Sequence, residues 1–93
     1  MSLLKLLSKK DCDKFLLALL ENGEMNFGKL AKLTKYPATT TRILKELIKE
    51  GLITRRVMQD EKRSVIYSLT PKGKKVALLL VELKELEGEE NSQ

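Results

Sequence analysis

Residues 26–56, NFGKLAKLTKYPATTTRILKELIKEGLITRR, contain the boundaries of two helices. Asn26 can cap a short helix, because its side-chain oxygen can accept a hydrogen bond from a backbone N–H of the first turn. Tyr36-Pro37 separates this helix from a second one, since the residue before proline avoids the helical region and proline suits the first helical position. Gly51 is expected to end the second helix. The stretch therefore predicts two helices joined by a tight turn, a helix-turn-helix.

The residue pattern after the second helix is extended rather than helical. Segments 52–58 (LITRRVM) and 63–69 (RSVIYSL) are rich in β-branched residues, and Val65, Tyr67 and Leu69 fall on one face of the second segment. The polar residues QDEK between the segments are typical of a short turn. The two segments therefore predict a β-hairpin.

Helices are also expected on both sides of this region. A first helix is predicted over about 9–22. The apolar residues in it recur at helical spacing: Cys12, Phe15, Leu16, Leu19 and Leu20. Ser8 can cap this helix, and Gly23 can end it. Thr70 and Pro71 have the residue types of a helix start and begin the last helix. The order helix, helix, helix, hairpin, helix predicts an α+β winged-helix fold, in which the hairpin is the wing.

The charge of the chain is concentrated in its middle. The net charge is +5, yet residues 29–63 alone hold ten lysines and arginines against four acids, an excess of six positive charges. The last residues are acidic, with five glutamates between positions 82 and 90. A basic block of this kind indicates a surface for nucleic acid, although a charge excess also occurs on ordinary solvated surfaces.

The composition excludes several classes of function. The chain has one cysteine and no histidine, whereas zinc sites need three or four ligands, so no metal or other cofactor is expected. No enzyme is expected, because Glu89-Glu90 lie in the acidic end, where no fixed geometry for acid–base work exists. No apolar run approaches the roughly 20 residues of a membrane span, and the beginning of the chain lacks a signal-peptide cleavage site. We therefore expect an intracellular, cytoplasmic protein with no membrane partner.

Residues 26–56, followed by DEKRSVIYSLTPKG at 60–73, resemble the MarR/SlyA-like family of winged-helix regulators. The pattern D-x-K-R-x-V-x-Y-x-L-T-x-x-G is the more specific part of this resemblance, which covers about residues 12–75. The size and leucine-rich ends are also similar to a small winged-helix protein of archaeal spindle-shaped viruses. The resemblance implies a homodimer that binds double-stranded DNA and usually represses transcription. It places the second helix of the helix-turn-helix in the major groove and the wing on the backbone or minor groove.

Two features depart from the family pattern. Tyr36 stands where relatives often have a capping serine or threonine, so the start of the helix at Pro37 lacks the usual cap. The helices outside the DNA-binding core are shorter than in typical members. Because those helices shape the pocket for small aromatic effectors in the family, the resemblance does not favour a small-molecule effector here.

The helix from Pro37 to about residue 50 is expected to have one buried and one exposed face. Its candidate DNA contacts are the outward residues Thr39, Thr41, Arg42 and Lys45. Arginine can read guanine with two hydrogen bonds, and threonine can contact a thymine methyl or a phosphate. The alternative is an ordinary solvated face. Three consecutive threonines favour DNA contact, because β-branched residues are mediocre helix formers.

The hairpin supplies the remaining candidates. Arg55 and Arg56 point to opposite faces of the sheet, so at most one faces DNA, and Arg56 is taken as the candidate. Lys62 and Arg63 at the tip could lie over a phosphate row or in a narrow minor groove. The family pattern implies that Arg63 pairs with Asp60 and leaves Lys62 as the contact. A merely solvated turn is the alternative.

Leucines at the two ends predict a dimer interface. The candidate interface residues are Leu3, Leu4, Leu7, Leu79, Leu83 and Leu86. One domain of this size cannot bury both ends, so they would meet a second copy, unless they wrap their own core in a monomer. The expected organisation is a dimerisation segment at 1–8, a winged-helix core at 9–70, a dimerisation helix at 71–87 and a flexible acidic tail at 88–93.

The functional hypothesis is a homodimeric regulator bound to a pseudo-palindromic site in double-stranded DNA. The alternative is a winged-helix module that binds proteins without specific DNA binding. Single-stranded or RNA binding is less favoured, because the few aromatic residues form no stacking platform. Cys12 lies on the apolar stripe and is interpreted as a core residue, with a redox switch or an intersubunit disulfide as the alternative.

Overall fold

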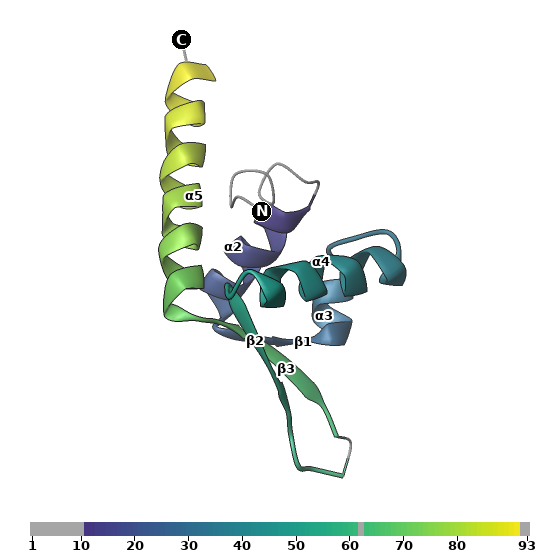
Figure 1. Cartoon of the computed structure of the whole chain (residues 1–93). Helices are drawn as coiled ribbons and strands as arrows, with labels where there is room; N and C mark the ends of the chain where they lie inside the picture. The colour runs from purple at the N-terminus through teal and green to yellow at the C-terminus, as the bar shows by residue number, and fades with distance from the viewer. Residues whose placement is uncertain (1–10, 62, 92–93) are drawn as a thin grey trace.

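Figure 1 shows the computed structural model, which describes residues 11–61 and 63–91. Its elements are α2 (Cys12–Asn22), β1 (Glu24–Asn26), α3 (Phe27–Ala31), α4 (Pro37–Lys49), β2 (Ile53–Val57), β3 (Val65–Leu69) and α5 (Pro71–Asn91). The strands form one antiparallel sheet in the order β1-β3-β2. The predicted α+β winged-helix fold is confirmed, with α3 and α4 as the helix-turn-helix and β2–β3 as the wing.

The strand β1 was not predicted from the sequence. It is three residues long, which is too short for an alternating pattern to be recognised. It forms because Met25 lies opposite Tyr67 of β3, and both side chains are buried. The strand thus covers one edge of β3, so that the central strand of the sheet is paired on both sides.

The ends of two helices differ from the sequence-based boundaries. Helix α2 begins at Cys12, preceded by Asp11 in a left-handed conformation with φ of 72°. The predicted start near residue 9 and its cap Ser8 lie outside the described residues. Helix α5 continues to Asn91, whereas the sequence placed its end at 87 and an acidic tail after it. Nothing in the residue pattern beyond 87 breaks a helix, since Gly88 alone costs only about 1 kcal/mol relative to alanine.

The predicted helix ends in the middle of the chain are confirmed. The side chain of Asn26 accepts a hydrogen bond of 2.8 Å from the Lys29 N–H at the start of α3. Gly23 and Gly51, which follow α2 and α4, have positive φ angles of 83° and 74°. Glycine adopts this region without the steric cost that a side chain would bring.

The core lies between α2, α4, the sheet and the first half of α5. Its fully buried large side chains include Phe15, Leu16, Leu19, Leu30, Ile43, Leu47, Leu52 and Ile53. Burial of each such side chain contributes roughly 1.5–3 kcal/mol. Helix α2 packs beside α5, where Lys84 and Asp13 form an ion pair of 3.4 Å. Because this pair is partly exposed, its contribution to stability is small.

The molecule is elongated, with extents of 53 × 25 × 22 Å. Figure 1 shows the reason: α5 extends beyond the body at one end, and the β2–β3 wing projects at the other. None of the described helices has the length and apolar character that a membrane crossing requires.

Thr70 connects the turn after α4 with the start of α5. Its backbone N–H donates to the Leu52 carbonyl at 3.0 Å, and its hydroxyl donates to the Gly51 carbonyl at 2.6 Å. The same hydroxyl oxygen accepts from the Gly73 N–H at 3.0 Å, which is the predicted N-cap of α5. Lys72 Nζ adds a hydrogen bond of 3.0 Å to the Glu50 carbonyl. We call these contacts the Thr70 junction.

Gly73 is the position at which the Thr70 junction tolerates the least change. A Cβ at this residue would collide with the Leu52 carbonyl group, which is backbone and cannot move aside. Gly73→Ala should therefore lower the free energy of unfolding by about 1–3 kcal/mol. Gly88→Ala in the same helix is the control, because no atom lies within 4 Å of the added methyl group. It should be neutral or stabilising by up to about 1 kcal/mol. Denaturant unfolding measures both changes in unfolding free energy. Equal changes in the two variants would contradict this account.

Candidate nucleic-acid interface

Helix α4 carries one buried stripe and a broad exposed surface. Thr40, Ile43, Leu44 and Leu47 face the core, as expected for the inward positions. Of the candidate contacts on this helix, Thr41, Arg42 and Lys45 are exposed and Thr39 is half-buried. The exposed surface is divided into two flanks, each of which borders a hollow.

The first flank faces the amino-terminal end of α2 and the turn between α3 and α4. The hollow there has a volume of about 500 Å³ and is lined by Asp11, Lys14, Lys32, Leu33, Thr34, Lys35, Tyr36, Thr39 and Arg42. We call it the α2-side hollow. It contains four cations and one carboxylate, and that carboxylate, on Asp11, pairs with Lys14 at 3.2 Å. The hollow therefore keeps a clear excess of positive charge.

The second flank faces the sheet. Here Thr41, Lys45 and Ile48 of α4 line a hollow of about 310 Å³ together with Phe27, Leu44, Arg55 and Tyr67. We call it the sheet-side hollow. Its lining is mostly apolar, and its two cations come from different elements, Lys45 from α4 and Arg55 from β2.

Arg55 and Arg56 lie on opposite faces of β2, as the sequence indicates. Arg55 is paired with Tyr67, so its side chain is on the face that carries α4. Arg56 is paired with Ile66 on the other face, where its guanidinium lies 3.4 Å from the carboxylate of Glu24. The structure thus brings Arg55, rather than the candidate Arg56, next to the candidate residues of α4.

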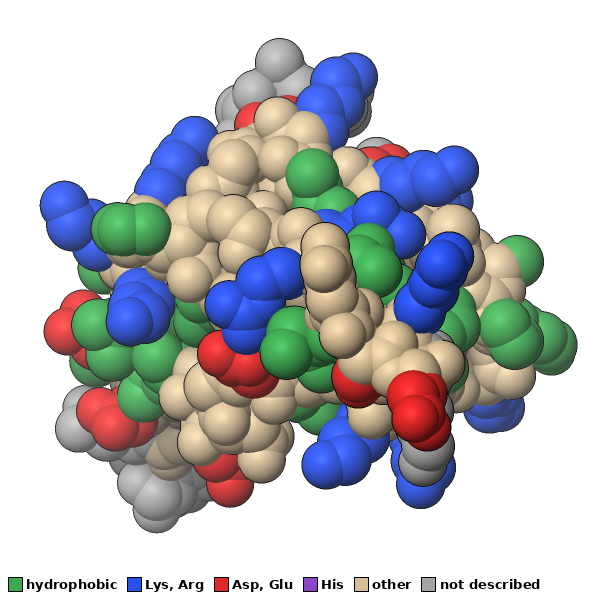
Figure 2. All heavy atoms as spheres, turned by 90° about the horizontal axis from the view of Figure 1, so that it is seen from below, with side chains coloured by type: hydrophobic (Ala, Val, Ile, Leu, Met, Phe, Trp, Pro, Cys, Tyr) green, Lys and Arg blue, Asp and Glu red, His purple; other side chains and the backbone are tan. Residues whose placement is uncertain are grey.

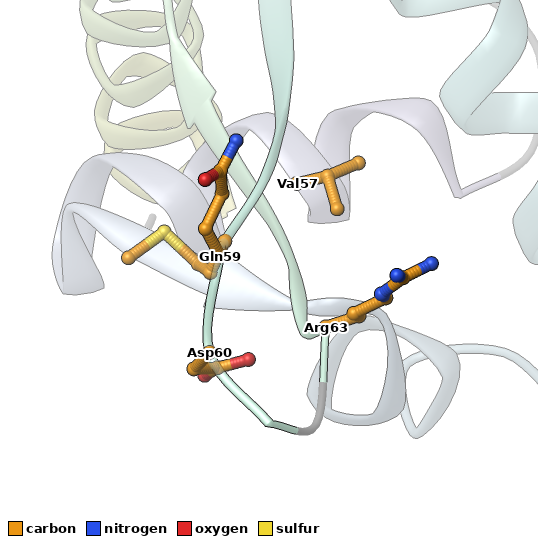
Figure 3. A pocket seen from close by; sticks show the side chains of 5 residues that line it. Val57, Gln59, Asp60 and Arg63 are labelled. Atoms are coloured by element: carbon orange, nitrogen blue, oxygen red, sulfur yellow. The ribbon is translucent and has the colours of Figure 1, made fainter.

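The tip of the wing is a turn closed by a hydrogen bond of 3.2 Å from the Arg63 N–H to the Asp60 carbonyl. Arg63 has a left-handed φ of 46°. The structure does not form the expected ion pair between the described residues Arg63 and Asp60; one oxygen of the Asp60 carboxylate accepts a hydrogen bond of 3.3 Å from the Ser64 N–H. Figure 3 shows the Arg63 side chain directed away from Asp60. The guanidinium is therefore available at the exposed tip, and Lys62 lies outside the described residues.

The wing also carries exposed apolar side chains. Val57 and Met58 are 46% and 36% exposed, and with Gln59, Asp60 and Arg63 they line a shallow hollow of about 480 Å³. Figure 2 shows the molecule from the wing end: Lys and Arg side chains are spread over this face, and the acidic ones lie mainly in the lower part of the view. The face is thus basic but not uniformly so.

The start of α4 is held without a side-chain cap, as the presence of Tyr36 suggested. Thr34 takes over part of this role from the preceding turn. Its hydroxyl lies 3.0 Å from the Tyr36 carbonyl and 2.7 Å from the hydroxyl of Thr40, which is fully buried. A hydroxyl has one proton, so Thr34 donates to the carbonyl while Thr40 donates to Thr34. This chain of hydrogen bonds satisfies the buried Thr40 and fixes the geometry of the turn.

The candidate dimer leucines of α5 are exposed. Leu79, Leu83 and Leu86 have exposed fractions of 58%, 55% and 56%, and Leu78 beside them has 55%. Their spacing places them along one side of the helix. We call them the leucine stripe. Leu3, Leu4 and Leu7 lie outside the described residues, and Cys12 is fully buried.

Three features of this interface were missed from the sequence. Arg55 was not chosen over Arg56, although the strand register that decides between them follows from the burial of Tyr67. Lys32 and Lys35 of the α2-side hollow were counted in the charge excess of residues 29–63, and Lys14 lies outside that block; none of the three was assigned to the surroundings of α4, because they come from other parts of the chain. Tyr36 was considered as a missing cap and as one of the few aromatic residues that form no stacking platform, but not as a contact to double-stranded DNA.

Residues 7–93 match the family of HxlR-like helix-turn-helix proteins. The chain belongs to the HxlR-like helix-turn-helix family. An uncharacterized protein of Methanocaldococcus jannaschii is 38% identical over 95 residues, which cover 98% of this chain and 78% of that protein.

Solved structures agree with this family. The crystal structure of a possible HxlR family transcriptional factor from Thermoplasma volcanium matches all of this chain and 84% of its own, with 29% identity and a TM-score of 0.79. The transcriptional regulator SlyA matches 96% of this chain with 27% identity and a TM-score of 0.82, and the chain spans 64% of the length of SlyA. The resemblance to MarR/SlyA-like regulators is thereby confirmed. The chain is a DNA-binding transcriptional regulator of the winged-helix type.

The Thr34–Thr40 contact leads to a stability prediction. Thr34→Val keeps the shape of the side chain but leaves the buried Thr40 hydroxyl without its acceptor, which should cost about 1–3 kcal/mol of unfolding free energy. Thr54→Val is the control, because the Thr54–Ser68 hydroxyl contact of 3.1 Å is exposed and water can replace it. Denaturant unfolding should show the larger loss for Thr34→Val. Equal losses in the two variants would refute the proposed role of Thr34.

Proposed function

We propose that this regulator acts as a homodimer on a pseudo-palindromic site in double-stranded DNA, with one copy of α4 in the major groove of each half-site. The observation that carries the proposal is the position of cations on both flanks of α4. Lys14, Lys32 and Lys35 border one flank, and Arg55 borders the other. A helix placed in the major groove runs between two phosphate rows, so cations on both flanks match the charge of both strands.

The exposed residues of α4 have the chemistry for reading bases. Arg42 and Lys45 can each donate to the O6 and N7 acceptors of guanine, and arginine can do so with two hydrogen bonds. Thr39 offers a hydroxyl for a phosphate, and both Thr39 and Thr41 offer a methyl group for thymine. The Thr41 hydroxyl already donates to the Pro37 carbonyl at 3.2 Å, so it has no hydrogen left for a phosphate. Arg42 lies on the α2-side flank and Lys45 on the sheet-side flank, which supports contacts to neighbouring base pairs rather than to one.

The sheet and the wing would hold the helix in this position. We propose Arg55 as the contact from β2 in place of Arg56, because Arg56 is on the opposite face and paired with Glu24. Arg63 is proposed as a contact from the tip of the wing, where an arginine suits a narrow minor groove. The expectation that Lys62 contacts DNA stays part of the proposal.

The leucine stripe supports the homodimer. Exposed leucines aligned on one side of a helix are unfavourable in water and indicate a surface that another protein covers. A second copy of α5 is a suitable cover, because a two-fold axis brings identical apolar surfaces together. In this proposal 71–87 is the dimerisation helix, 1–8 adds to the same interface, and 9–70 binds DNA.

The decisive experiment is the selection of bound sites from random duplex DNA. An enriched inverted repeat, with half-sites about one helical turn or a multiple of it apart, is the expected result. Affinity should also fall with salt, with a slope of log K against log salt concentration of about −0.9 for each neutralised phosphate. Retention of a protein partner without enrichment of any duplex would favour the protein-binding alternative, to which the exposed leucine stripe would then belong.

Arg55 and Arg56 provide a matched test of which face meets DNA. Arg55→Ala should weaken binding to the selected duplex by about 1–3 kcal/mol if it meets a base edge. If it meets a phosphate, the salt slope should become smaller by about one. Arg56→Ala should leave both quantities nearly unchanged, because its side chain is on the other face of the sheet. Fluorescence anisotropy titrations at several salt concentrations would measure both. The reverse order of effects would exclude Arg55 as the contact.

The dimer is tested by a charge on the leucine stripe. Leu83→Glu would place a carboxylate in the apolar interface, where an unpaired charge costs several kcal/mol, so the protein should become monomeric. Ala38→Glu adds the same charge at an exposed position of α4 and should leave the dimer intact. Analytical ultracentrifugation at micromolar concentration distinguishes the two states. A dimeric Leu83→Glu variant would show that the stripe is not the interface.

A further inference from the structure

Tyr36 is an exposed aromatic residue beside the first turn of α4. Its side chain is 67% exposed, the largest value among the exposed large hydrophobic residues of the described chain. An exposed side chain of this size contributes little to the stability of the fold. Its position next to the candidate DNA contacts therefore calls for an explanation outside the core.

The backbone of Tyr36 is fixed although its ring is exposed. The Tyr36 carbonyl accepts hydrogen bonds from the Thr39 N–H at 3.1 Å, from the Thr40 N–H at 3.3 Å and from the Thr34 hydroxyl at 3.0 Å. Pro37 follows and restricts the Tyr36 backbone to the extended conformation that it adopts, with φ of −130° and ψ of 129°. The ring thus projects from a rigid base, so little conformational entropy of the backbone is lost when it binds.

The surroundings of Tyr36 indicate what the ring would meet. It lines the α2-side hollow with Thr39 and Arg42, which follow it at intervals of three residues along α4. Lys32 and Lys35 border the same hollow from the preceding turn. Aromatic carbon flanked by cations suits a sugar–phosphate chain, because phosphates pair with the cations while a deoxyribose or a base edge packs on the ring.

A tyrosine at this position also has a structural disadvantage. Serine, threonine, aspartate or asparagine would cap α4, whereas Tyr36 makes no side-chain cap. The start of α4 is therefore less stable than it would be with a capping residue at position 36. A role in binding accounts for this choice, and a role in folding does not.

We propose that Tyr36 is a specificity-determining residue, which packs its ring on a thymine methyl at the outer end of each half-site and donates its phenol hydrogen to a phosphate. Six residues separate it from Arg42, which is about 9 Å along α4. The base pair that Tyr36 influences should then lie about two or three steps from the one that Arg42 reads, at 3.4 Å per step. This inference rests on the proposed function and adds a residue and a base-pair position to it.

The test compares Tyr36→Ser and Tyr36→Phe with the wild-type protein on the selected duplex. Tyr36→Ser should bind about tenfold more weakly and lose the sequence preference at that outer base pair. It should also melt at a higher temperature, because serine supplies the missing cap. Tyr36→Phe keeps the ring, so it should retain the preference and lose only the phosphate contact. Weaker binding in a more stable protein cannot arise from damage to the fold.

A direct observation is possible because the chain has only two tyrosines, Tyr36 and the buried Tyr67. Protein labelled with 3-fluorotyrosine should give two fluorine resonances, and the Tyr36→Phe variant identifies the one from Tyr36. Addition of the selected duplex should shift the Tyr36 resonance more than that of Tyr67.

The outcomes separate the two levels of the proposal. If the wild-type protein binds no duplex, the proposed function fails and this inference fails with it. If the wild-type protein binds but Tyr36→Ser binds equally well with the same preference, or the Tyr36 resonance does not move, only the role of Tyr36 is overturned.

Discussion

The Thr70 junction is the constraint on which the arrangement of this molecule depends. One residue satisfies the carbonyls of Gly51 and Leu52 and at the same time caps α5. Without these hydrogen bonds, the carbonyls of Gly51 and Leu52, which follow α4, and the Gly73 N–H in the first turn of α5 would lose their partners within the protein. The close approach of Gly73 to the Leu52 carbonyl leaves no room for a side chain at this position. The positions of α4, the wing and α5 are thereby fixed relative to one another.

The sheet completes this frame. The central strand β3 pairs with β2 on one side and with the short β1 on the other, and Tyr67 of β3 faces the core. Its register decides which arginine of β2 lies beside α4. A shift of one residue would exchange Arg55 and Arg56 between the two faces. The location of a positive charge on the candidate interface thus follows from the burial of one aromatic side chain.

Much of the fold follows from local chemistry that the sequence displays. The helix ends were predictable because each depends on the side chain or the backbone freedom of a residue a few positions away at most. These residues are Gly23, Asn26, Gly51 and the Thr70-Pro71 pair. The strand β1 escaped prediction because its partner lies some forty residues away and three residues carry no period. The two hollows beside α4 could not be derived either, since Lys14, Lys32 and Arg55 come from three different elements. The Arg63–Asp60 pair expected at the tip of the wing could not be judged from the sequence, because the direction of the Arg63 side chain depends on the left-handed backbone that Arg63 adopts in the turn.

The same distinction separates the parts of the candidate site. The outward face of α4 was predictable from helical spacing alone, and the exposed α5 leucines were recognisable from their periodicity. The proposed binding role of Tyr36 was not predictable. In the sequence, an aromatic residue before Pro37 indicates only a poor helix cap, and its exposure and its basic neighbours become known from the structure.

The continuity of α5 has a mechanical consequence for any assembly built through its leucines. A single uninterrupted helix leads from the Thr70 junction to Leu83, about 20 Å away at 1.5 Å per residue. A helix of this length does not bend appreciably under thermal forces, so two subunits joined there would keep their groove-entering helices at a set separation. Insertion of a single base pair between half-sites rotates one of them by about a tenth of a helical turn. A rigid pair of arms cannot follow that rotation, and the strain would fall on the DNA rather than on the protein.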